Sequence, residues 1–154
     1  MIANIDNNPN PAAIPIWPLR RAELTAWQVD KPGIMTAWCE SSGFAASAGE
    51  FILLPSESGG LAGVLLGLGD AAAQPGDYWA FGTLAKSLPA GHYRIEGDLP
   101  ALHAYHAALA WALSHYRFTR YHGAGDKDDP VAMLCLPENV DGAALGAAVK
   151  GSFL

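Results

Sequence analysis

The sequence has few charged residues, no excess of basic residues and no long apolar run. Only 16% of its 154 residues are Asp, Glu, Lys or Arg, against about 25% in an average soluble protein. Nine basic and 15 acidic residues give a net charge of −6, whereas nucleic-acid binders present a basic face. No apolar run approaches the roughly 20 residues that span a bilayer. These absences predict a protein with no nucleic-acid partner and no membrane segment.

Cysteine is scarce as well. Cys39 and Cys135 are the two cysteines, and they lie far apart without metal-binding spacing. Free thiols are typical of a reducing cytosol. The first residues, MIANIDNNPNPAA, are polar and proline-rich, unlike a signal peptide. We therefore expect a cytoplasmic protein.

The length fits one domain. Residues 1–11, rich in Asn and Pro, are expected to form a disordered leader, and residues 12–154 the single domain. Apolar periodicity and turn residues predict alternating strands and helices. The expected strands are residues 12–17, 51–54, 61–68, 92–96 and 131–136, and the expected helices are 20–29, 32–38, 78–88, 99–121 and 143–153. This order predicts an α/β fold, a mixed sheet with helices on both faces.

Three of these elements carry more specific predictions. Prolines place the strand at 12–17 at a sheet edge, and continuous apolarity places 131–136 at the centre. The long helix is expected to bury one stripe of its surface. That stripe consists of Leu102, Tyr105, Leu109, Ala112 and Tyr116.

The segment from Glu50 to Asp70 predicts a β-hairpin that ends in a glycine-rich loop. Gly67, Gly69 and Asp70 are the candidate cofactor-binding residues, because the loop resembles the start of a dinucleotide-binding motif. Pro75 follows closely and would interrupt the helix that such a motif needs. A tight structural turn is the favoured interpretation, and nucleotide binding is the alternative.

Other reactive groups form no convincing site. His103 and His106 have a spacing that two metal ligands use, but no third ligand is evident. Cys39 lies in a helical pattern and is expected to be inert. Arg117 and Arg120 end the long helix, where they either cap it or stack a base. The sequence predicts no catalytic residue, no metal ligand and no bound cofactor in this chain.

The last helix carries an apolar stripe of Leu145, Ala148, Val149 and Phe153. Such a stripe packs either on the sheet or on a neighbouring domain, and an exposed part would mark an interface.

Four stretches of the sequence are IPIWPL, AGEFILLPSESGGLAGVLLGLGD, LPAGHYRIEG and ALAWALSHYRFTRY. Together they resemble the N-terminal domain of the leucyl (cytosol) aminopeptidase family. The resemblance implies a macro-domain-like fold and a parent metallopeptidase whose C-terminal domain holds two zinc or manganese ions. The family's catalytic string, Asn-Thr-Asp-Ala-Glu-Gly-Arg-Leu, does not occur in these residues. No catalytic or metal-binding residue of the family can be assigned here.

The expected function is therefore that of a non-catalytic domain of a leucyl aminopeptidase, which contributes to assembly and to access to the active site. Its expected partners are its own C-terminal catalytic domain and neighbouring copies in a homo-hexamer. The alternative is a macro-like module that binds a nucleotide or ADP-ribose. A third and weaker hypothesis is a hydrolase that uses Cys39 or the histidine pair.

Overall fold

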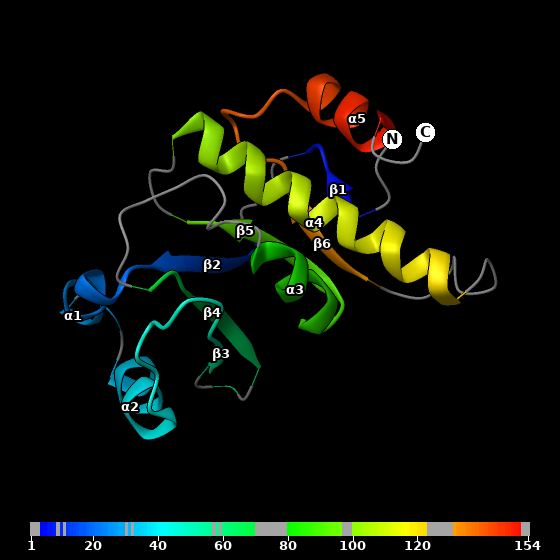
Figure 1. Cartoon of the computed structure of the whole chain (residues 1–154). Helices are drawn as coiled ribbons and strands as arrows, with labels where there is room; N and C mark the ends of the chain where they lie inside the picture. Colours follow the sequence, from blue (N-terminus) through cyan, green and yellow to red (C-terminus); the bar gives the residue numbers. More distant parts are fainter. Residues whose placement is uncertain are drawn as a thin grey trace. The chain divides into compact units, whose positions relative to one another are not determined.

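The structure is a computed structural model, and it describes residues 4–8, 10, 12–29, 31, 33–56, 58, 60–69, 80–96, 100–122 and 131–151. For residues 115–122 and 151 only the backbone is described. The described part contains six strands and five α-helices (Figure 1). The chain divides into two compact units. Each unit is described by itself.

Unit 1 comprises residues 1–13, 74–94 and 98–154. Its strands are β1 (Ile5–Asp6), β5 (Gly91–Ile95, of which Ile95 belongs to unit 2) and β6 (Ala132–Cys135). Strand β6 runs parallel to both neighbours, pairing Leu134 with Ile5 on one side and with Tyr93 on the other. The expected central position of this strand is confirmed within the unit.

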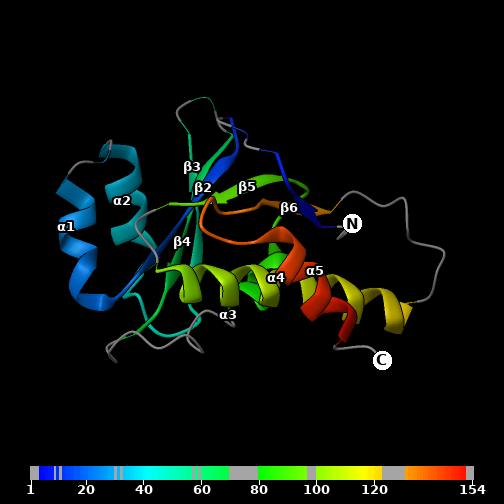
Figure 2. The ribbon, with the colours of Figure 1, turned by 90° about the horizontal axis from the view of Figure 1, so that it is seen from above.

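The helices of unit 1 are α3 (Ala80–Ser87), α4 (Ala101–His122) and α5 (Gly142–Gly151). Helix α4 contacts α3, α5 and β1, and the two views show it running across β5 and β6 (Figures 1 and 2). The Asp141 carboxylate caps α5 by accepting the N–H groups of Ala143 and Ala144 at 2.9 and 3.3 Å.

The expected buried stripe of the long helix is right for Ala112, which is fully buried, and wrong for Leu102. Leu102 is 55% exposed, and the buried face consists mainly of alanines around Trp111. These buried residues are Ala104, Ala107, Ala108, Ala110, Trp111, Ala112 and Ser114. Small side chains are needed here because α3 approaches closely: a Cβ on Gly82 would lie 3.1 Å from the Ala110 carbonyl oxygen.

The expectation that residues 1–11 form a disordered leader is wrong for its central part. Ile5 and Asp6 form β1 and pair with β6. Asn4 is buried and donates from Nδ2 to the main-chain oxygen of Trp111 at 2.7 Å. These long-range contacts make the segment part of unit 1.

Unit 2 comprises residues 14–73 and 95–97. Its strands are β2 (Ile14–Leu19), β3 (Phe51–Pro55) and β4 (Leu61–Gly67). Between β2 and β3 the chain forms the 3-10 helix η1 (Arg21–Glu23) and the helices α1 (Leu24–Val29) and α2 (Gly33–Ser42). Strand β4 pairs in parallel with β2 and antiparallel with β3. The predicted hairpin is therefore confirmed.

Strand β2 is not an edge strand, so that expectation is wrong. It pairs with β4 on one side, and the Ile16 carbonyl accepts the Glu96 N–H at 2.9 Å. Its prolines, Pro15 and Pro18, alternate in orientation along the strand and remove one donor from each side. The remaining groups are sufficient for pairing.

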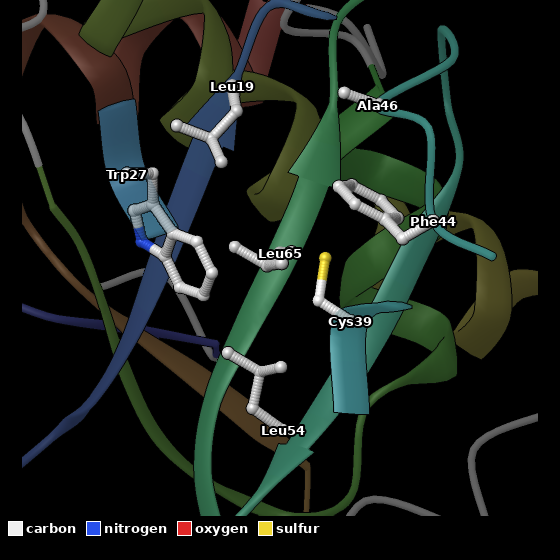
Figure 3. Packing of buried hydrophobic residues seen from close by; sticks show 7 residues of the cluster. All are labelled: Leu19, Trp27, Cys39, Phe44, Ala46, Leu54 and Leu65. Atoms are coloured by element: carbon white, nitrogen blue, oxygen red, sulfur yellow. The ribbon is translucent and has the colours of Figure 1, made fainter. Parts of the chain in front are cut away.

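A hydrophobic cluster holds α1 and α2 to β3 and β4 in unit 2. Figure 3 shows Leu19, Trp27, Cys39, Phe44, Ala46, Leu54 and Leu65, all buried. Helix α2 ends at Ser42, and the next residue, Gly43, has φ +69°. The N–H groups of Gly43 and Phe44 donate to the carbonyls of Glu40 and Cys39 at 3.1 and 3.3 Å. This C-terminal cap turns the chain so that Phe44 enters the cluster.

In the described part of the chain, no helix is both long enough and apolar enough to cross a bilayer.

Candidate functional site

The glycine loop, for which the sequence favours a structural turn with nucleotide binding as the alternative, lies at the C-terminal end of β4. We call Gly67, Leu68 and Gly69 the glycine junction. Each of its three N–H groups donates to a main-chain carbonyl of unit 2. Gly67 donates to Glu50 at 2.6 Å, Leu68 to Leu19 at 2.8 Å and Gly69 to Ala46 at 2.8 Å. A phosphate-binding loop needs these groups to point at the ligand. Here they hold neighbouring segments together.

The carbonyl oxygens of the junction are bonded as well. Gly67 accepts the Gly49 N–H at 3.0 Å, and Gly69 accepts the Arg21 N–H at 3.2 Å. The Leu68 carbonyl accepts Nη1 of Arg20 at 2.8 Å. The junction therefore ties the start of η1 and the loop before β3 to the end of β4.

Glycine is required at the two positions for different reasons. Gly69 has φ +78°, a conformation that L-residues adopt only with strain. Gly67 is required by close approach, because a Cβ there would lie 2.3 Å from the Ser47 carbonyl oxygen and 2.6 Å from the Ala46 carbonyl carbon. Both obstacles are main-chain atoms.

The loop packed against Gly67 is itself held tightly. Ala46 is fully buried and has φ +56° although it carries a side chain. Oε1 of Glu50 accepts the N–H groups of Ala45 and Ser47 at 3.1 and 3.2 Å. Nη2 of Arg21 donates to Oγ of Ser47 at 3.3 Å. These bonds keep the loop in its strained conformation. Sequence reasoning missed the role of Glu50, because the N–H groups of Ala45 and Ser47 come within reach of its carboxylate only once the loop has folded.

The geometry favours the structural interpretation of Gly67 and Gly69. Asp70, the third candidate residue, lies outside the described residues. Pro75, which was expected to interrupt a following helix, lies there too. The main-chain N–H groups of Gly67, Leu68 and Gly69 are all used inside the protein.

The two cysteines are free and buried. Burial is the main cause that raises the pKa of the Cys39 thiol, and a hydrogen bond from Gln28 opposes it. Burial also raises the pKa of the Cys135 thiol, reinforced by the charge of Asp6. A raised pKa disfavours the nucleophilic thiolate. The sulfur of Cys39 points into the cluster toward Leu65 (Figure 3), which fits a packing role.

The histidines do not assemble a metal site in the described residues, which contain no group of three or more His, Cys, Asp or Glu residues able to hold an ion. His103 and His106 are both on α4. The side chains of Arg117 and Arg120, and of the histidines near them, lie outside the described residues.

One polar contact was not anticipated from the sequence. Nε2 of His92, on β5, lies 3.6 Å from Oδ2 of Asp6, on β1. Register explains it, because β6 pairs Asp6 with Cys135 and His92 with Met133. All four side chains therefore share one face of the unit 1 sheet, and the His92 side chain is 47% exposed there.

The stripe on α5 is divided. Leu145 and Val149 are buried within this chain, so these two residues are covered by the domain itself and not left for a neighbouring domain. They are covered because α5 packs against α4. Phe153 lies outside the described residues.

Comparison with solved structures places this arrangement in a class. Cytosol aminopeptidase from Coxiella burnetii matches with a TM-score of 0.70 and 28% identity, over 93% of this chain and 29% of that one. The bottromycin maturation enzyme BotP in complex with Mn matches with a TM-score of 0.60 and 20% identity, over 90% of this chain and 29% of that one. A tomato leucine aminopeptidase variant matches with a TM-score of 0.61 and 15% identity, over 96% of this chain and 34% of that one. The fold is that of an aminopeptidase N-terminal domain.

The family profile described as "M17 aminopeptidase, N-terminal domain" matches residues 14–137. The chain therefore belongs to the M17 aminopeptidase family, and the expected resemblance and α/β fold class are both confirmed. No curated protein matches at a significant level. The chain spans about one third of the length of the solved relatives.

Proposed function

We propose that this chain serves as the non-catalytic N-terminal domain of a leucyl-aminopeptidase-type metallopeptidase. The observation that carries the proposal is the family match over residues 14–137. The distribution of chemistry supports it: the glycine junction uses its donors internally, and the described cysteines are buried thiols with raised pKa values.

The domain would act by supporting assembly and by shaping access to active sites that a catalytic domain supplies. In this proposal the parent enzyme removes N-terminal residues from peptides, with two zinc or manganese ions in the catalytic domain polarising the carbonyl and activating water. The partners would be that catalytic domain and neighbouring copies in a hexamer, and the location the cytosol. The complex of BotP with Mn is consistent with a family that uses metal.

A chimera tests the structural contribution. This chain would replace the N-terminal domain of the Coxiella burnetii cytosol aminopeptidase, joined at the boundary of the structural match. We expect the chimera to retain the oligomeric mass of the parent enzyme and a substantial part of its Mn²⁺-dependent hydrolysis of leucine p-nitroanilide. Multi-angle light scattering and absorbance at the nitroaniline band measure the two properties.

Two controls frame that result. The Coxiella enzyme without any N-terminal domain reports what the catalytic domain does alone, and a fusion to an unrelated α/β domain of similar size reports mere bulk. A chimera that behaves like either control, although correctly folded by circular dichroism, would refute the proposed role.

A further inference from the structure

Two tryptophans of unit 2 meet beside its hydrophobic cluster, and we call Trp17 and Trp27 the tryptophan corner. Trp17 lies on β2 and Trp27 on α1. Their ring centroids are 5.5 Å apart and their planes are inclined at 66°. Trp27 is buried in the cluster, whereas Trp17 packs against it and is half-buried. The corner therefore has one wall inside the unit and one wall that reaches the surface.

The main chain of β4 fixes the position of the Trp17 ring. A Cβ on Gly63 would lie 2.3 Å from Cζ3 and 3.1 Å from Cη2 of Trp17. The six-membered ring therefore lies directly over Gly63, where any larger residue would displace it. Sites built on strands and helices are held more precisely than sites built on loops. Both walls of the corner meet this condition.

A cation already occupies the tryptophan corner. Nζ of Lys31, in the segment between α1 and α2, lies 5.1 Å from the ring centroid of Trp17 and 5.8 Å from that of Trp27. Both distances fall within the range of roughly 6 Å over which an indole face attracts a cation. Among the described residues no carboxylate forms an ion pair with Lys31. The two indoles are therefore the groups that hold its ammonium.

Trp27 also carries a donor that Lys31 cannot use. Its Nε1 is buried and has no hydrogen-bond partner among the described residues, although a buried indole N–H usually finds an acceptor. Figure 3 shows the Nε1 edge of the ring turned away from Leu65. An ammonium group has three donors and no acceptor. Lys31 therefore satisfies the cationic preference of the corner and leaves its one donor unused.

We propose that the tryptophan corner is a binding site for a small quaternary ammonium ligand that carries an oxygen acceptor close to its cationic nitrogen. The ammonium group of the ligand takes the place of Nζ between the two rings, and its oxygen accepts the Nε1–H of Trp27. A quaternary ammonium suits aromatic walls better than a primary one, because the lysine ammonium is strongly hydrated and is costly to desolvate.

In this proposal Lys31 is an internal competitor for the site. It is half-buried, so its side chain can swing into solvent when the ligand enters. Because the lysine is tethered, its effective concentration at the corner is on the order of millimolar or higher. The wild type should therefore bind the ligand more weakly than a chain from which this ammonium has been removed.

The inference goes beyond the proposed function and does not depend on it. The site uses residues of unit 2 to which that proposal gives no part in metal or peptide binding. A failed titration would leave the chimera result standing, and a failed chimera would leave the titration standing.

Titration of the full chain with choline, followed in proton–nitrogen correlation spectra, tests the proposal. The sequence has five tryptophans, and each indole N–H is a separate reporter. We expect the signals of Trp17 and Trp27 to move, with that of Trp27 moving downfield as its Nε1–H gains an acceptor. Lys31→Ala should bind choline in the low millimolar range, about tenfold more tightly than the wild type. Lys31→Arg retains a cation and should bind like the wild type.

Lys86→Ala is the matched control, because Lys86 is an exposed lysine on α3, in unit 1. It should bind choline like the wild type. A second control replaces choline by its neutral carbon isostere, dimethylbutanol, which should bind Lys31→Ala at least about tenfold more weakly because it lacks the charge.

Three results would each overturn the proposal. They are choline-independent signals of Trp17 and Trp27 in both the wild type and Lys31→Ala, equal affinity for choline and dimethylbutanol, and the same gain in affinity in Lys86→Ala as in Lys31→Ala. If Lys31→Ala did not fold, the wild type would still decide the matter, through the movement of these two indole signals and its preference for choline over the neutral isostere.

Discussion

Replacing Gly67 by alanine should lower the free energy of unfolding by about 3 kcal/mol, at the upper end of the usual cost of overpacking. The added Cβ would lie 2.3 Å from the Ser47 carbonyl oxygen and 2.6 Å from the Ala46 carbonyl carbon. These are main-chain atoms of a loop fixed by Glu50 and by the Gly69 N–H, so no side-chain rotation relieves the clash. Urea unfolding followed by far-UV circular dichroism measures the change. In a chain of this length it corresponds to a fall in Tm of about 10 °C.

Gly146→Ala is the matched control for that substitution. Gly146 lies within α5, and a Cβ there meets nothing within 4 Å. Alanine in a helix interior should stabilise by about 0.5–1 kcal/mol. If Gly67→Ala were as stable as the wild type, the glycine junction would not be the tight structural turn described above. The alternative, that the loop binds a nucleotide, would then be favoured.

Replacing Trp111 by alanine should cost about 3–5 kcal/mol. Trp111 is fully buried on α4 and lies 6.1 Å from the ring centroid of Tyr93. Its Nε1 donates to the Ala132 carbonyl at 3.2 Å, so alanine would leave both a cavity and an unpaired acceptor in β6. Near-UV circular dichroism and urea unfolding measure the loss of packing and of stability.

Trp38→Ala makes the same chemical change at a site that is 48% exposed on α2. Its cost should stay within about 1 kcal/mol. Equal costs at the two positions would contradict the description of Trp111 as a fully buried side chain.

Local signals account for the parts of the fold that the sequence predicted correctly. The hairpin of β3 and β4 follows from two apolar runs on either side of a Ser/Gly turn, in which the Ser56 N–H donates to the Gly60 carbonyl at 2.7 Å. The position of β6 between two strands follows from its continuous apolarity.

The parts that were wrong depend on contacts far away in the sequence. Strand β1 is two residues long, too short to give a periodic signal, and it exists because β6 pairs with it. The buried face of α4 is alanine-rich because α3 and α5 both pack against this helix, and the hydrophobicity of individual residues on α4 does not reveal those neighbours.

The candidate site shows the same limit. The sequence correctly singled out Gly67 and Gly69 as special, because glycines at the end of a strand indicate a special backbone or a close approach. It did not indicate what approaches them. The Ala46–Ser47 segment lies against Gly67 only because Glu50 and the cap of α2 shape the intervening loop, and those contacts form in the folded protein.

An aminopeptidase assay on the purified, full-length chain tests the central claim most directly, namely that these residues contain no catalytic centre of their own. The chain would be incubated with leucine p-nitroanilide and either Mn²⁺ or Zn²⁺, with the Coxiella burnetii enzyme as the positive control and metal alone as the blank. We predict nitroaniline release no faster than in the blank. Release that depends on the metal, rises in proportion to the concentration of the chain and is abolished by a chelator would contradict the account.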